Sequence, residues 1–421
     1  MNVNTFNAFR SRNYRLYFTG QSISLLGTWM QKTAVSWIVY SQTQSKFMLG
    51  VSVFATLFPS AVFSTIGGVV SDRYNRYRVL LLTQVLSMIQ AILLTLVVYF
   101  QKYAVWEIIS LSVILGIING FDMPARQSLV YDMVDDKKDL SNAVALNSSM
   151  VNLSKLLGPA IAGIAIENLG EVVCFGLNAF SFIAVITSLL LMKLPPYVVQ
   201  SHTKNILGEL KEGFQYINQT PAIRFVLLML ALVSLLVLPF TTLMPVYAKD
   251  IFQGTASTFG LIDSAIGLGA FIGALYLASL KTGSDLHTIL ARNTFILGAG
   301  LILFAYTSWY PLALCFIAFA AFGMMSQVTI SNTILQTQVT PSMRGRVISL
   351  YLMVYSSALP IGGLLIGTIS HYIGVQATVL GEGILALLLG GLHIRSLQKA
   401  KLKPDVTPTV DAPSAEIALH S

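Results

Sequence analysis

The sequence predicts an all-α membrane protein with twelve transmembrane helices in two six-helix bundles. Three observations lead to this prediction: a composition that is 55% hydrophobic and only 10% charged, a series of long apolar segments, and a one-sided distribution of basic residues. Soluble domains carry about 25% charged residues, so most of the surface of this chain must face lipid. Because about 20 apolar residues span a bilayer, the membrane span is the natural unit of this sequence.

Twelve segments are long and apolar enough to cross a bilayer. The first six cover residues 14–40, 48–70, 79–100, 105–130, 142–167 and 171–193. The second six cover residues 223–248, 257–281, 288–307, 310–336, 346–370 and 375–396. We therefore expect an amino-terminal bundle over residues 1–193 and a carboxy-terminal bundle over residues 222–397.

Basic residues distinguish the two sides of the predicted membrane region. Most of the 26 Lys and Arg residues fall in loops and tails on one side, and only Lys46, Lys102 and Lys249 fall in loops on the other. Basic loops face the cytoplasm, so we expect a multi-pass membrane protein with both termini cytoplasmic. The expected location is the bacterial inner membrane. The tail over residues 398–421 is rich in Pro, Thr and Ala and is expected to be disordered.

The longest polar stretch before the tail joins the two predicted bundles and covers residues 194–221. Ile206, Leu210, Phe214 and Ile217 recur in it at helical spacing, with charged residues off that face. This pattern predicts a cytoplasmic linker that contains an amphipathic helix lying on the inner membrane surface.

The two halves share sparse but similarly placed residues, which indicates an internal duplication. Three glycines in and just after the fifth segment recur about 204 residues later, in and just after the eleventh. The pairs are Gly158 and Gly362, Gly163 and Gly367, and Gly170 and Gly374. Tryptophans also precede the fourth and tenth segments at matching places, where indole rings anchor a helix at the membrane interface. These are Trp106 and Trp309.

A dense group of charges lies in the predicted loop between the second and third segments, where the sequence reads GGVVSDRYNRYR. Gly68, Asp72, Arg73 and Arg76 form the pattern G-x-x-x-D-R-x-x-R. This pattern resembles the signature loop of the major facilitator superfamily. The resemblance implies the major facilitator fold, in which two six-helix bundles rock about a central site.

We expect this loop to act as a gate between the bundles. Gly68 would let a neighbouring helix approach closely, and Asp72 would face the positive amino terminus of a helix in the opposite bundle. Arg76 would pair with Asp132 at the inner end of the fourth segment. The alternative is that the basic residues only orient the chain, but orientation does not require an acid among the arginines.

Three further stretches narrow the resemblance. They read GFDMPARQSLVYDMV, LSNAVALNSSMVNLSKLLGPAIAG and PSMRGRVISLYLMVYSSALPIGGLLIG. They resemble the exporter branch that contains enterobactin exporters and macrolide-efflux proteins, over about residues 9–395. The resemblance implies a secondary active transporter that exports a small organic molecule, a siderophore or a lipophilic drug, by alternating access, commonly driven by protons. An importer or uniporter of a small metabolite on the same fold is the alternative.

Ionisable residues inside spans are costly and are functional candidates by default. Asp122 and Arg126 are four residues apart and can pair on one helix face, either as a fixed pair or as part of a gate. Lys32, Asp263 and Glu382 are further candidates. Glu382 lies among glycines and apolar residues, and desolvation there favours the protonated form, which suits a proton carrier. Asp263 is the rival, and the sequence leaves the choice open.

The fifth segment carries a polar face near the middle of the membrane. Asn152, Lys155 and Pro159 share this face, and a cation at that depth requires an acid, water or a bound anion. Lys155 therefore faces the cavity or belongs to a buried structural pair. The step from Gly158 to Pro159 resembles the fifth-segment motif of antiporters and can bend the helix, although ordinary helix packing would also use these residues.

Other classes of function find no support in the sequence. The five His residues are not spaced as metal ligands, and neither a Gly-rich Lys loop for nucleotide phosphates nor a nucleophile elbow is present. The scattered basic residues lack the aromatic-rich polar face of a nucleic-acid binder. We therefore expect no enzyme, cofactor, metal or nucleic-acid partner. The expected protein is a monomer whose partners are a small-molecule substrate, protons and the lipid bilayer.

Overall fold

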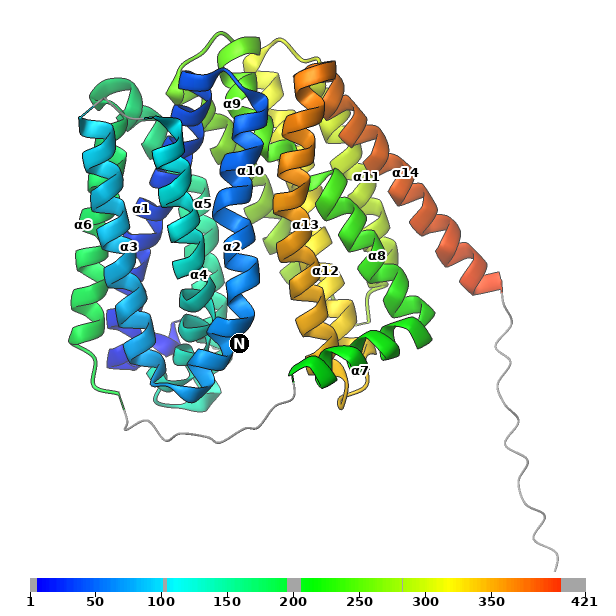
Figure 1. Ribbon diagram of the computed structural model, residues 1–421. Coiled ribbons are helices and arrows are strands. Elements are labelled where there is room, and N and C mark those ends of the chain that lie inside the picture. The colour runs from blue at the N-terminus through cyan, green and yellow to red at the C-terminus, as the bar shows by residue number, and fades with distance from the viewer. Residues whose placement is uncertain (1–5, 101–103, 195–205, 282, 403–421) are drawn as a thin grey trace, which may run out of the picture.

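The computed structural model describes residues 6–100, 104–194, 206–281 and 283–402 of the chain. Its regular structure in these ranges is helical, and the long helices run alongside one another in two groups (Figure 1). The first group lies on the left of Figure 1 and the second on the right.

The amino-terminal group is built from six long helices that pack mainly on one another. They are α1 (Arg12–Thr43), α2 (Lys46–Arg73), α3 (Arg76–Tyr99), α4 (Val105–Met133), α5 (Leu140–Leu169) and α6 (Glu171–Leu190). Short 3₁₀ helices, η1 (Asn7–Arg10) and η2 (Lys137–Asp139), precede α1 and α5.

The carboxy-terminal group begins with a broken helix, in which α8 is followed by a 3₁₀ turn, a short α-helix and a π-helical turn. These elements are α8 (Pro221–Leu236), η3 (Leu238–Leu243), α9 (Met244–Val246) and η4 (Tyr247–Ile251). Five long helices follow. They are α10 (Ala256–Ala278), α11 (Leu286–Ala305), α12 (Tyr310–Gln338), α13 (Arg344–Ile373) and α14 (Val375–Leu402).

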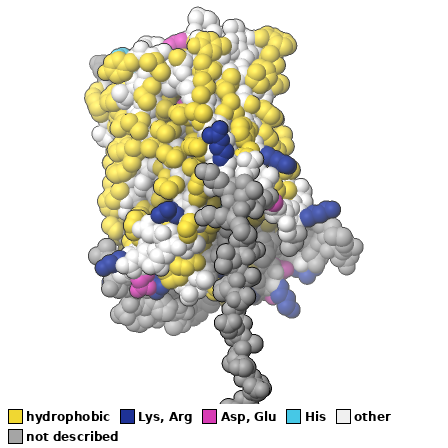
Figure 2. All heavy atoms as spheres, turned by 90° about the vertical axis from the view of Figure 1, so that its right-hand side faces the viewer, with side chains coloured by type: hydrophobic (Ala, Val, Ile, Leu, Met, Phe, Trp, Pro, Cys, Tyr) yellow, Lys and Arg dark blue, Asp and Glu magenta, His cyan; other side chains and the backbone are white. Residues whose placement is uncertain are grey.

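Eleven of the described segments are long and apolar enough to cross a membrane, with the broken helix from α8 to η4 counted as one. Helix α1 is the remaining predicted span. It has 32 residues and packs along α5 and α6, but polar residues such as Gln21, Gln31 and Lys32 make it less apolar than the others. Figure 2 shows apolar side chains over most of one face, with most visible Lys and Arg in its lower part. The predicted all-α membrane fold is confirmed.

The two ends of the helical bundles differ in charge. The basic end holds the turn between α2 and α3 and the helix α7 (Ile206–Gln219), at the bottom of Figure 1. The opposite end holds the turn between α1 and α2 and the π-helical η4. Helix α14 continues to Leu402, so residues 398–402 are helical where the sequence predicted the start of a disordered tail; residues 403–421 lie outside the described residues.

The predicted amphipathic helix is present as α7, but its apolar residues do not share one environment. Ile217 is buried among residues of α8 and α13, whereas Phe214 is 60% exposed. Gly213 packs against Arg346 of α13, and the same arginine forms a 2.7 Å ion pair with Glu212. Helix α7 is therefore attached to the second group through Gly213 and Ile217, while Phe214 on its other side stays exposed.

The glycine pattern that suggested a duplication occupies equivalent places in the two groups. Gly170 ends α5 with φ +83°, and Gly374 ends α13 with φ +87°, a backbone conformation that favours glycine. Gly158 packs against α1, and Gly362 packs against α8 and η3, which are the first helical segments of their respective groups. The two groups therefore repeat one helical plan, as expected from the sequence.

The two groups meet along two seams, α2 with α13 and α5 with α10. Both seams are closed by glycines at the opposite end. A methyl group added at Gly163 would lie 2.7 Å from the carbonyl oxygen of Ala256, and one added at Gly367 would lie 2.7 Å from that of Lys46. The backbones of the paired helices are thus in direct contact, which only small residues permit.

Candidate functional site

The charged turn between α2 and α3 has the local structure that its residues favour. The Asn75 side chain accepts hydrogen bonds from the backbone amides of Tyr77 and Arg78, so it caps the first turn of α3. Arg76 forms an ion pair of 3.9 Å with Asp132 of α4, as predicted. Asp72 lies exposed at the basic end.

The close helix contact expected at Gly68 for the state in which the basic end is shut is not made among the described residues of this conformation. Open space surrounds the place where a side chain at Gly68 would begin. The close approach occurs at Gly67, where an added methyl group would lie 2.2 Å from the carbonyl oxygen of Gly120 in α4. One residue corresponds to about 100° around a helix, so the two glycines of the pair face different neighbours.

Asp122 and Arg126 form the predicted ion pair within α4. The carboxylate also accepts hydrogen bonds from Thr83, at 2.8 Å, and Gln84, at 2.5 Å, both on α3. Asp122 is 3% exposed. All four side chains belong to the amino-terminal group, and this arrangement favours a fixed brace between α3 and α4 over a moving gate.

Three charged side chains from three helices gather at the junction of the two groups, near the middle of the spans. Lys32 of α1 and Lys155 of α5 both point to the ring of Trp29, with Nζ atoms 4.5 Å and 5.6 Å from its centroid. Asp263 of α10 interacts electrostatically with Lys32. These residues, Trp29, Lys32, Lys155 and Asp263, are called the central cluster below.

Helical spacing explains why Asp263 reaches this place. Gly260 and Gly267 lie three residues before and four residues after it, so all three share one face of α10. A methyl group at Gly260 would lie 2.3 Å from the carbonyl oxygen of Pro159, and one at Gly267 would lie 2.8 Å from that of Lys155. The glycines bring α10 against α5 and thereby place Asp263 where it can interact with Lys32.

The other predicted residues of α5 frame the central cluster. Gly158 is in contact with Trp29, because an added methyl group would lie 2.5 Å from its Cβ atom. Pro159 is buried in the seam with α10, and Asn152 is partly exposed on the turn before Lys155. The side chain of Lys32 is exposed although it lies within the span of α1.

Glu382 lies apart from this cluster. It is 1% exposed in α14, and neither carboxylate oxygen has a hydrogen-bond partner among the described residues. Helix α14 packs against α8, η3, α11 and α13, all in the carboxy-terminal group. Glu382 therefore does not face the junction between the groups.

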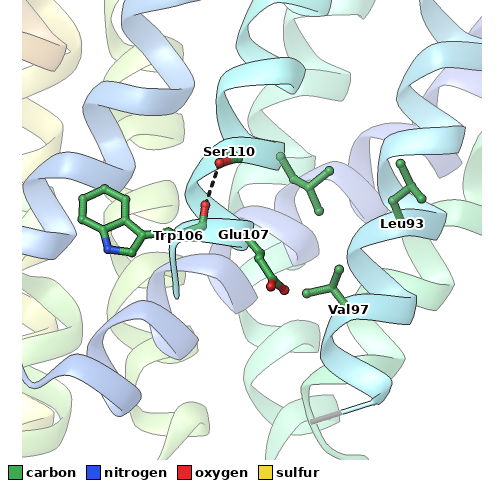
Figure 3. Close-up of a pocket in the computed structure, with 6 residues that line it drawn as sticks. Leu93, Val97, Trp106, Glu107 and Ser110 are labelled. Carbon is green, nitrogen blue, oxygen red and sulfur yellow. Dashed lines mark hydrogen bonds between the residues drawn. The ribbon is translucent and has the colours of Figure 1, made fainter. Parts of the chain in front are cut away.

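A shallow apolar pocket of about 380 Å³ lies between α3 and α4 near the opposite end. In Figure 3, Glu107 points into the gap between the two helices while Trp106 turns away. Its lining comes entirely from these two helices. They are neighbours within one group, so this pocket is not part of the junction that holds the central cluster.

Contacts at the opposite end join the two groups and were not predicted from the sequence. Tyr40 donates a hydrogen bond to Asp250 of η4. Lys46 donates to the carbonyl oxygen of Ser370 at 3.2 Å, and Lys249 donates to that of Ser41 at 3.4 Å. The central cluster is therefore closed from this end by two glycine seams and three polar contacts.

Trp29 was also missed. The available signal was its spacing: it precedes Lys32 by three residues, which places both side chains on one helix face.

Comparison with known sequences identifies the family. The profile described as transmembrane secretion effector matches residues 3–420, which is nearly the whole chain. The chain belongs to this family of the major facilitator superfamily. The predicted resemblance is confirmed, and the family is one of transporters rather than enzymes.

Several relatives match along almost their full length. The staphyloferrin A transporter of Staphylococcus aureus is 25% identical, with 92% of this chain and 97% of the relative covered. Macrolide efflux protein A of Streptococcus pyogenes is 23% identical, with coverages of 94% and 99%. The enterobactin exporter EntS of Shigella flexneri is 27% identical, with 95% of each chain covered.

Solved structures share the fold. A POT family transporter in complex with 5-aminolevulinic acid superposes with a TM-score of 0.74 at 15% identity, over 92% of this chain and 96% of that one. A bacterial homologue of the lysosomal transporter Spinster, in an inward-facing and unoccupied conformation, gives a TM-score of 0.70 at 14% identity, over 94% and 99%. At such identities the similarity concerns the fold alone.

Proposed function

We propose that this transporter exports a small organic molecule from the cytoplasm by alternating access, in exchange for protons. The observation that carries the proposal is the central cluster. In this cluster Asp263 of one group interacts with Lys32 of the other, and Lys32 shares the Trp29 ring with Lys155. Charged groups within membrane spans are costly and are kept for function.

The closed opposite end supports alternating access. Backbone contact at the glycine seams separates the central cluster from that end, while the gate residues Asp72 and Arg73 are exposed at the basic end. We propose that the basic end faces the cytoplasm of a bacterial inner membrane. In the second state the seams would open, and Asp72 and Arg73, with the pair Arg76 and Asp132, would hold the basic end shut.

Asp263 is the better candidate for the proton carrier. A carboxylate between the two groups can change its counter-ion when substrate arrives or when the groups move. Glu382 can hold a proton, but it lies inside one group, where protonation would not act directly on the junction. We therefore assign the exchange to Asp263 and keep Glu382 as a second candidate.

The proposed substrate class is inferred from the substrates for which the relatives are named. Three relatives are named for staphyloferrin A, macrolides and enterobactin, so a siderophore or a lipophilic drug is the proposed cargo. The transporter is proposed to act as a monomer, because each chain contains both groups and the complete junction.

Transport into inverted membrane vesicles tests the proposal. Vesicles with the wild-type protein should accumulate enterobactin, staphyloferrin A or erythromycin when a proton gradient is imposed, and collapse of the gradient should stop accumulation. Asp263→Asn should remove the gradient dependence, whereas Glu107→Gln, outside the junction, should retain it. Uptake that runs down the cargo's own gradient and ignores protons would instead support the importer or uniporter alternative.

A further inference from the structure

We infer that the central cluster binds its cargo through a negatively charged group held between Lys32 and Lys155, so that the substrate is a small organic anion. The inference rests on the proposed transport function and goes beyond it, because it chooses between cargoes of different charge. It follows from an imbalance of charges at the junction of the two groups.

The two lysines lie close together. Their Nζ atoms are 4.5 Å and 5.6 Å from the same Trp29 centroid, so the ammonium groups are separated by at most about 10 Å, the sum of these distances. The two positive charges repel each other electrostatically. The aromatic face offers each cation a weak attraction, but it does not neutralise either charge.

Few charges are available nearby to balance the lysines. Helix α12, which packs on α10, carries no charged side chain, and the charges of η4, Lys249 and Asp250, are engaged at the opposite end. Among the described residues packed around the cluster, Asp263 is therefore the acid available to Lys32 and Lys155.

The charges deeper in the bundles do not alter this balance. The charge of Asp122 is neutralised by Arg126 within α4, and Glu382 lies inside the carboxy-terminal group. The cluster thus carries two positive charges against one negative charge.

An unbalanced cation in the middle of a membrane protein requires water or a bound anion. A carboxylate, catecholate or similar group of the cargo would supply the missing negative charge and would accept hydrogen bonds from both ammonium groups. A cationic cargo would meet two positive charges, and an uncharged cargo would leave the imbalance uncorrected. Of the relatives' differing cargoes, the structure favours the acidic ones.

Three probes with one ring system and different charges test the inference. They are 2-naphthoate, its methyl ester and 2-naphthylmethylamine, titrated by calorimetry into the purified full-length protein. We expect 2-naphthoate to bind more tightly than the other two. Lys155→Gln should weaken its binding about tenfold, as expected for loss of one charge-assisted contact, and should leave the ester unchanged. Lys211→Gln, on the exposed surface of α7, is the matched control and should change nothing.

A charge reversal gives a positive signal that a misfolded protein could not give. Lys155→Glu should reverse the preference, so that 2-naphthylmethylamine binds more tightly than 2-naphthoate. The inference is overturned if the wild-type protein binds the ester or the amine as tightly as the acid, or binds none of the three. It is also overturned if Lys155→Gln and Lys32→Gln leave acid binding unchanged.

The binding assay separates this inference from the proposed function. Charge-selective binding without proton-driven accumulation in vesicles would refute coupled export and would retain the anion site. If a cationic or neutral compound accumulates in a proton-driven manner and Lys155→Gln does not change its accumulation, export is supported and the anion site is refuted.

Discussion

Tyr40 of α1 donates a hydrogen bond to Asp250 of η4, and this bond joins the amino-terminal group of helices to the carboxy-terminal group. The donor and acceptor are 210 residues apart in the sequence. The bond lies at the opposite end of the molecule, beyond the glycine seams. It can exist only while that end is closed, so its strength contributes to the preference for this conformation.

Removing the hydroxyl group should favour opening of the opposite end. A hydrogen bond to a charged acceptor contributes about 1.5 kcal/mol or more, so Tyr40→Phe should shift the conformational equilibrium about tenfold toward the open form. Distances between two spin labels at the opposite end, one on each group, measure the shift in reconstituted protein.

The labels can be attached at Trp106→Cys and Trp309→Cys, because both side chains are exposed, after Cys174 and Cys315 are replaced by Ala. Tyr310→Phe is the control, since the Tyr310 hydroxyl bonds to α10 within its own group. An unchanged distance distribution in Tyr40→Phe would show that this bond does not stabilise closure.

A side chain in the glycine seam should prevent closure. In Gly260→Val the Cβ atom would lie 2.3 Å from the Pro159 carbonyl oxygen, which is part of the backbone and cannot move aside alone. We expect the protein to remain open at the opposite end and transport to fall below detection. Gly381→Ala is the control, because open space surrounds its added methyl group. Transport by Gly260→Val near the wild-type rate would contradict backbone contact at the seam.

The gate at the basic end should depend on the charge of Asp72. Asp72→Asn should impair transport without reducing membrane insertion, because an amide attracts a positive helix terminus much less than a carboxylate does. Vesicle transport normalised to the amount of inserted protein is the measurement. Asp135→Asn, which removes an exposed acid from another turn at the same end, should transport normally. Normal transport by Asp72→Asn would refute the gate.

The ion pair in α4 should contribute to stability rather than to transport. Asp122→Asn would leave Arg126 largely buried without its counter-charge. Breaking a buried ion pair in this way lowers the free energy of unfolding by about 3–5 kcal/mol. A clear fall in the melting temperature of the protein in detergent is expected. Combining Asp122→Asn with Arg126→Gln should recover most of the loss. A single variant as stable as the wild type would contradict the brace.

The two candidate proton carriers can be separated by the pH dependence of transport. Asp263→Asn should abolish this dependence, because the carboxylate beside Lys32 can then neither bind nor release a proton. Glu382→Gln should retain it, since Glu382 is enclosed in one group. Initial rates of vesicle transport between pH 6 and pH 8 give the comparison. Loss of the dependence in Glu382→Gln alone would transfer the role to that residue.

The fold and part of the site were predictable because they depend on local patterns. Apolar segment length and the position of basic loops define spans without tertiary information, and the spacing of Asn152, Lys155 and Pro159 defines one face of α5. The pair Arg76 and Asp132 was predictable because the signature loop joins helices that lie near each other.

Other features depend on contacts between distant segments. Lys32 and Asp263 come from different groups, so no periodicity in the sequence brings them together. Helix phase sets a second limit. In this conformation Gly67, and not Gly68, lies against α4, because neighbouring residues of a helix point about 100° apart. Helix α7 shows the same limit, because its periodicity predicted an apolar face but not that Ile217 packs on the second group while Phe214 stays exposed.

The glycine seams also bear on the energy supply of the cell. At Gly163 and Gly367 the paired helices lie too close for a water molecule between their backbones, and a continuous file of water molecules is what conducts protons. A transporter whose helices are in backbone contact can therefore remain in the membrane without substrate and without dissipating the proton gradient. On this view, Gly163 and Gly367 limit the leak of protons through the protein. A bulkier residue at either place would both increase this leak and block transport.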